Sequence, residues 1–214
     1  MIAIFDWDGT LCNSIDHIVE SMQYAARELQ MTPPPAAAVR DIVGLGLPEA
    51  INRLFPDIDD ALVADVTATY ARHFASPDRA PAQLFDGALS TLNSLRDRGI
   101  ELAVATGKSR RGLDRVLASL GLSSFFDATR CADETRSKPD PMMVHEILAE
   151  RRKSAVKAVV IGDSEYDLGM ARKAGVRSVA VSFGVHSEDR LAVYDPLAIV
   201  HDLPALLKLE VFGR

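Results

Sequence analysis

The residues of this chain that could do chemistry begin directly after its first apolar run. Residues 2–5 lead into the sequence DWDGT, whose two carboxylates belong to Asp6 and Asp8. Side chains two positions apart in an extended chain point to the same side, so this spacing brings the two carboxylates together. Crowded carboxylates either raise a pKa or require a cation. Oxygen ligands without clustered histidine or cysteine favour a hard ion, and Mg²⁺ is the cation we expect.

Further polar groups follow later apolar runs. Thr106 and Gly107 stand at a strand-to-helix turn, where backbone N–H groups form an anion site. Asp163 follows another apolar run and adds a third carboxylate, and Asp167 lies one helical turn later. Lys138 supplies a fixed positive charge. Carboxylates, a divalent cation, a hydroxyl, N–H donors and a lysine together indicate a phosphoryl-transfer site.

The elements that must position these groups are four short apolar runs, at residues 2–5, 102–105, 158–161 and 179–181. The runs are rich in Val, Ile and Ala and do not alternate with polar residues, which is typical of parallel strands covered on both faces. Helical patterns between them end at glycine residues. This alternation predicts an α/β fold with a doubly wound, Rossmann-like parallel sheet, in which ligands bind beyond the carboxyl ends of the strands.

One long segment, residues 14–82, breaks the alternation with helical patterns and no convincing strand. Ser14 is expected to cap a helix, and residues 61–74 repeat apolar side chains at helical spacing. Pro77 and Pro81 close the segment. The pattern predicts an all-helical insertion between the first strand and the rest of the sheet.

The length and composition suit this organisation, because 214 residues with 48% hydrophobic content can form one large domain that carries a smaller one. We expect an α/β core of residues 1–13 and 83–214 with the helical insertion at 14–82. A net charge of −6 argues against a nucleic-acid partner. No apolar stretch approaches the ~20 residues that cross a bilayer. With two cysteines and no visible signal peptide, we expect a cytoplasmic protein without a membrane partner.

Four motifs, in their order along the chain, resemble those of the haloacid dehalogenase-like hydrolases. They are DWDGT at 6–10, the turn at Thr106-Gly107, the pair Lys138-Pro139, and GDSEYD at 162–167. The helical insertion is similar to the cap domain of that family. The resemblance covers nearly the whole chain, and within the family it is strongest to the phosphoglycolate phosphatase group.

The resemblance implies a role for each carboxylate of the first motif. Asp6 would be the nucleophile that forms an aspartyl-phosphate. Asp8 would be the general acid/base that protonates the leaving group and then activates water. Asp6, the backbone carbonyl of Asp8 and Asp163 would hold Mg²⁺.

The other motifs would bind the transferring group. The resemblance implies that Thr106, Gly107 and Lys138 contact the phosphoryl oxygens and that Lys138 also steadies the nucleophile. Asp167 would support either the water shell of the metal or Lys138. The implied reaction is the Mg²⁺-dependent hydrolysis of a small phosphorylated metabolite.

Substrate selection is assigned to the insertion, which would act as a lid. The sequence Gly44-Leu45-Gly46 permits a tight turn and is the candidate for a loop that reaches into the cleft. If the substrate carries a carboxylate, as phosphoglycolate does, an arginine is expected to bind it. Arg40 and Arg53 flank the loop, and Arg53 is the preferred candidate. A solvent-facing arginine on a helix is the competing interpretation.

Two other functions stay open. A phosphomutase similar to β-phosphoglucomutase shares the core motifs and differs in cap residues. A phospho-accepting receiver domain is more remote, because receivers are shorter, lack a helical insertion and carry the accepting aspartate after a later strand. Two further activities of the family are excluded. Dehalogenases lack the second aspartate, and phosphonate-cleaving members need a cap lysine, which 14–82 does not contain.

Overall fold

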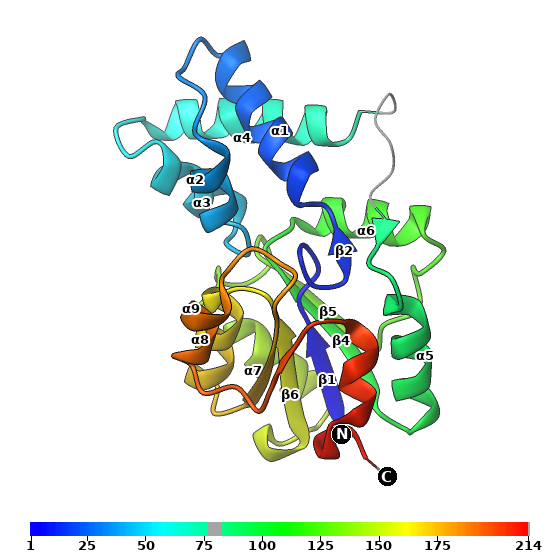
Figure 1. Ribbon diagram of the computed structural model, residues 1–214. Coiled ribbons are helices and arrows are strands. Elements are labelled where there is room, and N and C mark those ends of the chain that lie inside the picture. The colour runs from blue at the N-terminus through cyan, green and yellow to red at the C-terminus, as the bar shows by residue number, and fades with distance from the viewer. Residues whose placement is uncertain (77–82, 214) are drawn as a thin grey trace.

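The computed structural model describes residues 1–76 and 83–213, and its centre is a six-stranded parallel sheet (Figure 1). The strand order is β5-β4-β1-β6-β7-β8. The strands are β1 (Ile2–Phe5), β4 (Glu101–Thr106), β5 (Ala128–Cys131), β6 (Ala158–Gly162), β7 (Arg177–Val181) and β8 (Ile199–Val200). All four predicted apolar runs lie in this sheet, which confirms the doubly wound α/β fold.

Helices cover both faces of the sheet because the central strand is apolar on both sides. Ala3 and Phe5 of β1 pack against α5, α6 and the C-terminal turns, while Ile2 and Ile4 pack against α7 and α8. The helices of this core are α5 (Ala88–Asp97), α6 (Arg110–Ser119), α7 (Met142–Glu150), α8 (Glu165–Lys173) and α9 (Glu188–Ala192), with 3₁₀ turns η1 (Ala155–Lys157), η2 (Leu203–Lys208) and η3 (Glu210–Phe212). The two faces together enclose β1, whose four residues are fully buried.

Four further helices form a separate layer beyond the carboxyl ends of the strands (Figure 1). They are α1 (Ile15–Glu28), α2 (Ala36–Asp41), α3 (Leu47–Leu54) and α4 (Asp60–Phe74). We call them the helical insertion. Their apolar faces form a hydrophobic cluster of their own, to which α8 of the core contributes Tyr166. Helices were expected here, and helices are found.

The chain enters and leaves the helical insertion through two short strands. β2 (Cys12–Asn13) pairs antiparallel with β3 (Gln83–Leu84), so the two connections lie side by side. Neither strand was predicted, because two residues are too few to show a period. The predicted boundary at residue 82, with Pro77 and Pro81, lies outside the described residues.

Ser14 corrects one expectation. It occupies the N-cap position of α1, but its hydroxyl makes no capping hydrogen bond and instead donates to Asp8 Oδ1. In contrast, α4 is capped by Asp59, whose Oδ1 accepts from the N–H of Leu62 at 2.9 Å.

Both cysteines are buried in the core. Burial raises the pKa of Cys12 and of Cys131 to about 12, so each is a thiol at neutral pH. Within the described part of the chain, no helix has the length and hydropathy that crossing a membrane requires.

Candidate active site

Three neighbouring strands end at the site. Asp6 directly follows β1, Thr106 ends β4 and Asp163 directly follows β6, and the sheet order places these strands side by side. All three side chains are at most 2% exposed. The structure therefore gathers these residues at the carboxyl edge of the sheet, where open α/β folds bind ligands.

Lys138 lies at the centre of the site, fully buried between two carboxylates. Its Nζ is 2.5 Å from Asp6 Oδ1 and 2.6 Å from Asp167 Oδ1. Burial raises the pKa of Asp6, and Lys138 opposes that effect. Burial alone would lower the pKa of Lys138, but Asp167 and Asp6 raise it above its ordinary value. The ammonium is therefore charged and fixed.

A group of three carboxylates could hold a metal ion. Asp6, Asp163 and Asp167 each offer an oxygen, and these oxygens lie within 4.8 Å of one another. Oδ2 of Asp6 is buried and has no hydrogen-bond partner among the described residues. A donor set made only of carboxylate oxygens suits Mg²⁺. The arrangement therefore fits the expected cation.

The other two members of this group are held by hydrogen bonds. Asp163 accepts from Thr10 Oγ1 at 2.6 Å and from the N–H of Val185 at 3.0 Å. Asp167 Oδ2 accepts from Ser164 Oγ at 2.6 Å in the capping box that opens α8. Burial raises the pKa of Asp163 to about 7. Binding of a cation would favour its ionised form.

The carboxylate of Asp8 is not a member of that group. Its Oδ1 accepts from Ser14 and lies 3.0 Å from Nζ of Lys108. The expectation that Asp8 is a metal ligand therefore rests on its backbone carbonyl alone. Lys108 was given no role from the sequence, although its place two residues after Thr106, at the end of β4, could have indicated one.

The loop between α2 and α3 lies directly against the site. A Cβ atom added to Gly107 would be 2.3 Å from the carbonyl oxygen of Leu45, so the two backbones are in contact. The N–H of Gly46 donates to Ser137 Oγ, beside Lys138, at 2.8 Å. The structure thus brings the predicted Gly44-Leu45-Gly46 loop to the turn at Thr106-Gly107.

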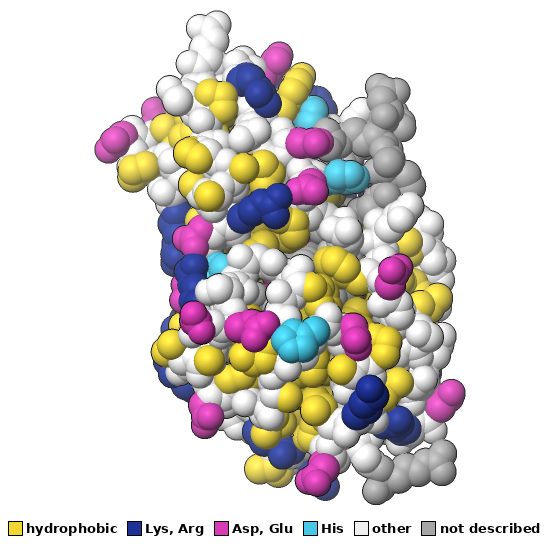
Figure 2. All heavy atoms as spheres, in the orientation of Figure 1, with side chains coloured by type: hydrophobic (Ala, Val, Ile, Leu, Met, Phe, Trp, Pro, Cys, Tyr) yellow, Lys and Arg dark blue, Asp and Glu magenta, His cyan; other side chains and the backbone are white. Residues whose placement is uncertain are grey.

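A second set of contacts joins the helical insertion to the core. Asp41, the last residue of α2, pairs with Arg190 of α9, which also pairs with Glu165 of α8. The hydroxyl of Tyr166 donates to the carbonyl of Asp41 at 2.9 Å. Figure 2 shows basic and acidic side chains adjoining at the left of the boundary between the two parts. The insertion is therefore docked on the core in this structure.

The two candidate arginines have different surroundings. Arg53 pairs with Glu49 at 3.0 Å and donates to Tyr166 Oη at 3.3 Å, which places it where the insertion meets the core. Arg40 pairs with Asp16 at 2.6 Å, and both side chains are exposed. Neither arginine has a recorded contact with the carboxylates of the site.

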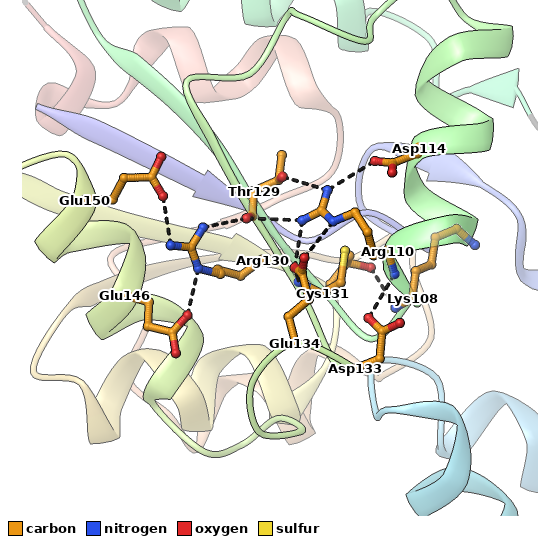
Figure 3. Close-up of polar contacts among 11 residues, drawn as sticks. Lys108, Arg110, Asp114, Thr129, Arg130, Cys131, Asp133, Glu134, Glu146 and Glu150 are labelled. Atoms are coloured by element: carbon orange, nitrogen blue, oxygen red, sulfur yellow. Dashed lines mark hydrogen bonds and ion pairs between the residues drawn. The ribbon is translucent and has the colours of Figure 1, made fainter.

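Away from the site, a network of charges lines a hollow of about 460 Å³ along strand β5 (Figure 3). Arg110 pairs with Glu134 at 2.7 Å and donates to the carbonyl of Thr129. Arg130 pairs with Glu146 at 2.7 Å and with Glu150 at 2.8 Å. Both guanidinium groups already bind carboxylates, so neither Arg110 nor Arg130 is free to bind an anionic ligand. The network lies along β5, which is an edge strand of the sheet.

The whole set of motifs has a match among known families. Residues 3–181 match the sequence model of the haloacid dehalogenase-like hydrolases. The chain belongs to this family. Among its relatives, the phosphoglycolate phosphatase of Rhodospirillum rubrum is 34% identical over 212 residues, which cover 95% of this chain and 88% of the relative.

A second relative and a solved structure support the same family assignment. Pyrophosphatase PpaX of Halalkalibacterium halodurans is 25% identical over 207 residues, which cover 96% of this chain and 94% of the relative. A solved haloacid dehalogenase-like family hydrolase from Streptococcus pneumoniae has the same fold, with a TM-score of 0.82 at 24% identity, covering 97% of this chain and 96% of that one. The expected enzyme class, a phosphatase of this family, is confirmed.

Proposed function

We propose that this phosphatase hydrolyses a phosphomonoester of a small metabolite through an aspartyl-phosphate formed on Asp6. The placement of Asp6 carries the proposal: Lys138 holds one carboxylate oxygen, and the other has no hydrogen-bond partner among the described residues. A carboxylate fixed at one oxygen and open at the other can attack phosphorus without losing its position. The covalent intermediate divides a slow hydrolysis into two faster displacements.

The two displacements share one acid/base group. In the first, an oxygen of Asp6 bonds to phosphorus, the bond from phosphorus to the ester oxygen breaks, and Asp8 gives its proton to the leaving oxygen. In the second, water attacks phosphorus, Asp8 takes a proton from it, and the bond to Asp6 breaks. Ser14 and Lys108 hold the carboxylate of Asp8 in place for both steps.

The remaining residues of the site bind the transferring group. Thr106, the N–H of Gly107 and Lys138 would contact the phosphoryl oxygens, and Asp167 keeps Lys138 aligned.

Mg²⁺ is the proposed cofactor. Asp6, the backbone carbonyl of Asp8 and Asp163 would hold it. When bound, the ion supplies positive charge to the transferring group.

The proposed substrates have an anionic leaving group, as phosphoglycolate does. The support is the naming of relatives as phosphoglycolate phosphatase and pyrophosphatase. Residues 14–82 would act as a cap that encloses the leaving group, with the Gly44–Gly46 loop against the site. Arg53 stays the preferred candidate for contact with a substrate carboxylate, ahead of Arg40.

The test replaces Asp6 by Asn, which keeps the size of the side chain and removes the nucleophile. We expect Asp6→Asn to lose at least about 10³-fold in kcat on a panel of phosphorylated metabolites with Mg²⁺. A chelator should abolish the wild-type activity, and Mg²⁺ should restore it. Asp57→Asn, at an exposed position, is the matched control. Near-wild-type turnover by a folded Asp6→Asn protein would exclude the mechanism.

A further inference from the structure

Lys108 is a cation held between the core and the helical insertion. Its Nζ lies 3.0 Å from Oδ1 of Asp8 and 4.5 Å from the ring centroid of Phe74, the last residue of α4. The Lys108 side chain is 11% exposed. A carboxylate and an aromatic face both favour a positive charge, so the position is built for an ammonium group.

Lys108 is largely buried and pairs with a single carboxylate of the described residues, which distinguishes it from Lys138 and from Arg53. Lys138 is enclosed by two carboxylates, and the side chain of Arg53 is 45% exposed beside Glu49. In the described part of the chain, Lys108 pairs with one carboxylate. An ammonium group has three N–H donors, and the ion pair with Asp8 leaves donors available to a ligand.

The position of Asp8 shows which part of a substrate would reach Lys108. Under the proposed function, Asp8 protonates the leaving oxygen, so its carboxylate lies against the bond between phosphorus and the leaving group. Lys108, in direct contact with Asp8, lies next to the atoms just beyond that oxygen. The transferring group would be contacted by Lys138, whose Nζ lies 2.5 Å from Oδ1 of the nucleophile Asp6. The two lysines therefore face different halves of a substrate.

We propose that Lys108 binds an anionic group carried by the leaving group, such as the carboxylate of a 2-phosphocarboxylate or the second phosphate of pyrophosphate. This inference rests on the proposed function and names the class of substrate that the site selects. Phe74 lies over the ammonium group, and a charge in such a largely buried place attracts an anion more strongly than the same charge in water does. The contact of Leu45 with Gly107 closes the insertion over the same turn.

The experiment compares substrates that differ in the charge of the leaving group. The full-length protein with Mg²⁺ is assayed on 2-phosphoglycolate, on pyrophosphate and on ethyl phosphate, whose leaving group is neutral. Lys108→Met keeps the length of the side chain and removes the charge. Lys173→Met, at the exposed end of α8, is the matched control. Arg53→Ala tests the competing cation.

We expect Lys108→Met to lower kcat/KM on the two anionic substrates by at least about 30-fold more than on ethyl phosphate, chiefly through KM. Lys108→Arg should retain part of the preference for the anionic substrates over ethyl phosphate. Phe74→Leu, made in the wild-type enzyme, should weaken that preference. Lys173→Met should match the wild type on all three substrates. If only one anionic substrate is affected, that substrate identifies which anion the lysine binds.

Other outcomes overturn the inference. An equal loss on all three substrates would mean that Lys108 acts only by positioning Asp8. Selectivity lost in Arg53→Ala and kept in Lys108→Met would assign the anion to the arginine. A wild-type enzyme with no preference for anionic leaving groups would reject the inference and leave the phosphatase proposal standing. A wild-type enzyme inactive on every phosphomonoester would reject both.

Discussion

The hydroxyl of Ser14 could either cap helix α1 or hydrogen-bond to the carboxyl group of Asp8. At the start of α1 it could accept from a free backbone N–H, as Asp59 does for α4, but it donates to the carboxylate of Asp8 instead. The carboxyl group of Asp8 is buried, and a buried polar group needs a hydrogen-bond partner. Helix α1 therefore lacks a side-chain cap, and the hydroxyl of Ser14 holds the side chain of Asp8 instead.

The different partners of Ser14 and Asp59 predict opposite effects on activity and stability when each residue is replaced by alanine. Ser14→Ala should lower kcat/KM about tenfold, because Asp8 loses one of its two partners, while the melting temperature changes little since no capping bond is lost. Asp59→Ala should do the reverse, costing about 1 kcal/mol of stability and leaving kinetics unchanged. Steady-state assays and thermal unfolding of both variants measure this. A loss of stability without a loss of rate in Ser14→Ala would contradict it.

Among the elements, the loop from α2 to α3 and the turn after β4 depend on each other. The carbonyl oxygens of Gly44 and Leu45 occupy the space where a side chain on Gly107 would stand. Only a residue without a Cβ allows the two backbones to meet. A glycine is therefore required at position 107 because the backbone of residues 44–45 packs against it, as well as because of the turn in which it lies.

Gly107→Ala should therefore push the insertion away from the core. We expect kcat/KM to fall by about 100-fold because the leaving group is no longer enclosed. The radius of gyration from small-angle scattering should rise while the melting temperature of the core stays close to that of wild type. Gly112→Ala, whose nearest neighbour to a new Cβ is the Ser109 hydroxyl at 3.3 Å, is the control. An unchanged scattering profile with full activity would show that the contact is dispensable.

The elements also show where sequence reasoning stops. Runs such as 158–161 are buried on both faces, so their composition alone identifies them as strands. β5, with the sequence ATRC, carries two half-buried residues at the sheet edge and lacks that signature. The carboxylates and Lys138 could be found because they follow recognisable motifs. The contact between Lys108 and Phe74 could not, because it depends on how the helical insertion packs against the core.

For the molecule as a whole, buried carboxylates link stability to pH. Burial raises the pKa of Asp163 to about 7, and that of Asp6 is also raised. Between about pH 4 and pH 7 the metal-free folded chain then holds protons that the unfolded chain has released. The contribution of Asp163 and Asp6 to the free energy of unfolding is therefore greatest at low pH and is lost as the pH rises. His186 has a lowered pKa and acts in the opposite direction, so a variant is needed to separate them.

We expect the melting temperature of the wild type, relative to that of Asp163→Asn, to fall between about pH 5.5 and about pH 8 in chelator. With Mg²⁺ the difference should reverse, because the ion binds ionised carboxylates and stabilises the folded state more at the higher pH. Thermal unfolding at several pH values, with and without the ion, measures both. Parallel curves for the two proteins would mean that Asp163 does not titrate in this range.

The central place of β1 also sets the order in which the chain can fold as it is made. Ile2 pairs with Glu101 on one side and with Ala158 on the other, so β1 leaves the ribosome before both of the strands that complete it. At roughly 5–20 residues per second, its second partner follows roughly ten to thirty seconds later. The helices α1–α4 contact mainly one another and can collapse during that interval. Until then Ile2, Ile4 and Phe5 lack their second sheet partner, so this apolar run is exposed for longer than the strands made after it.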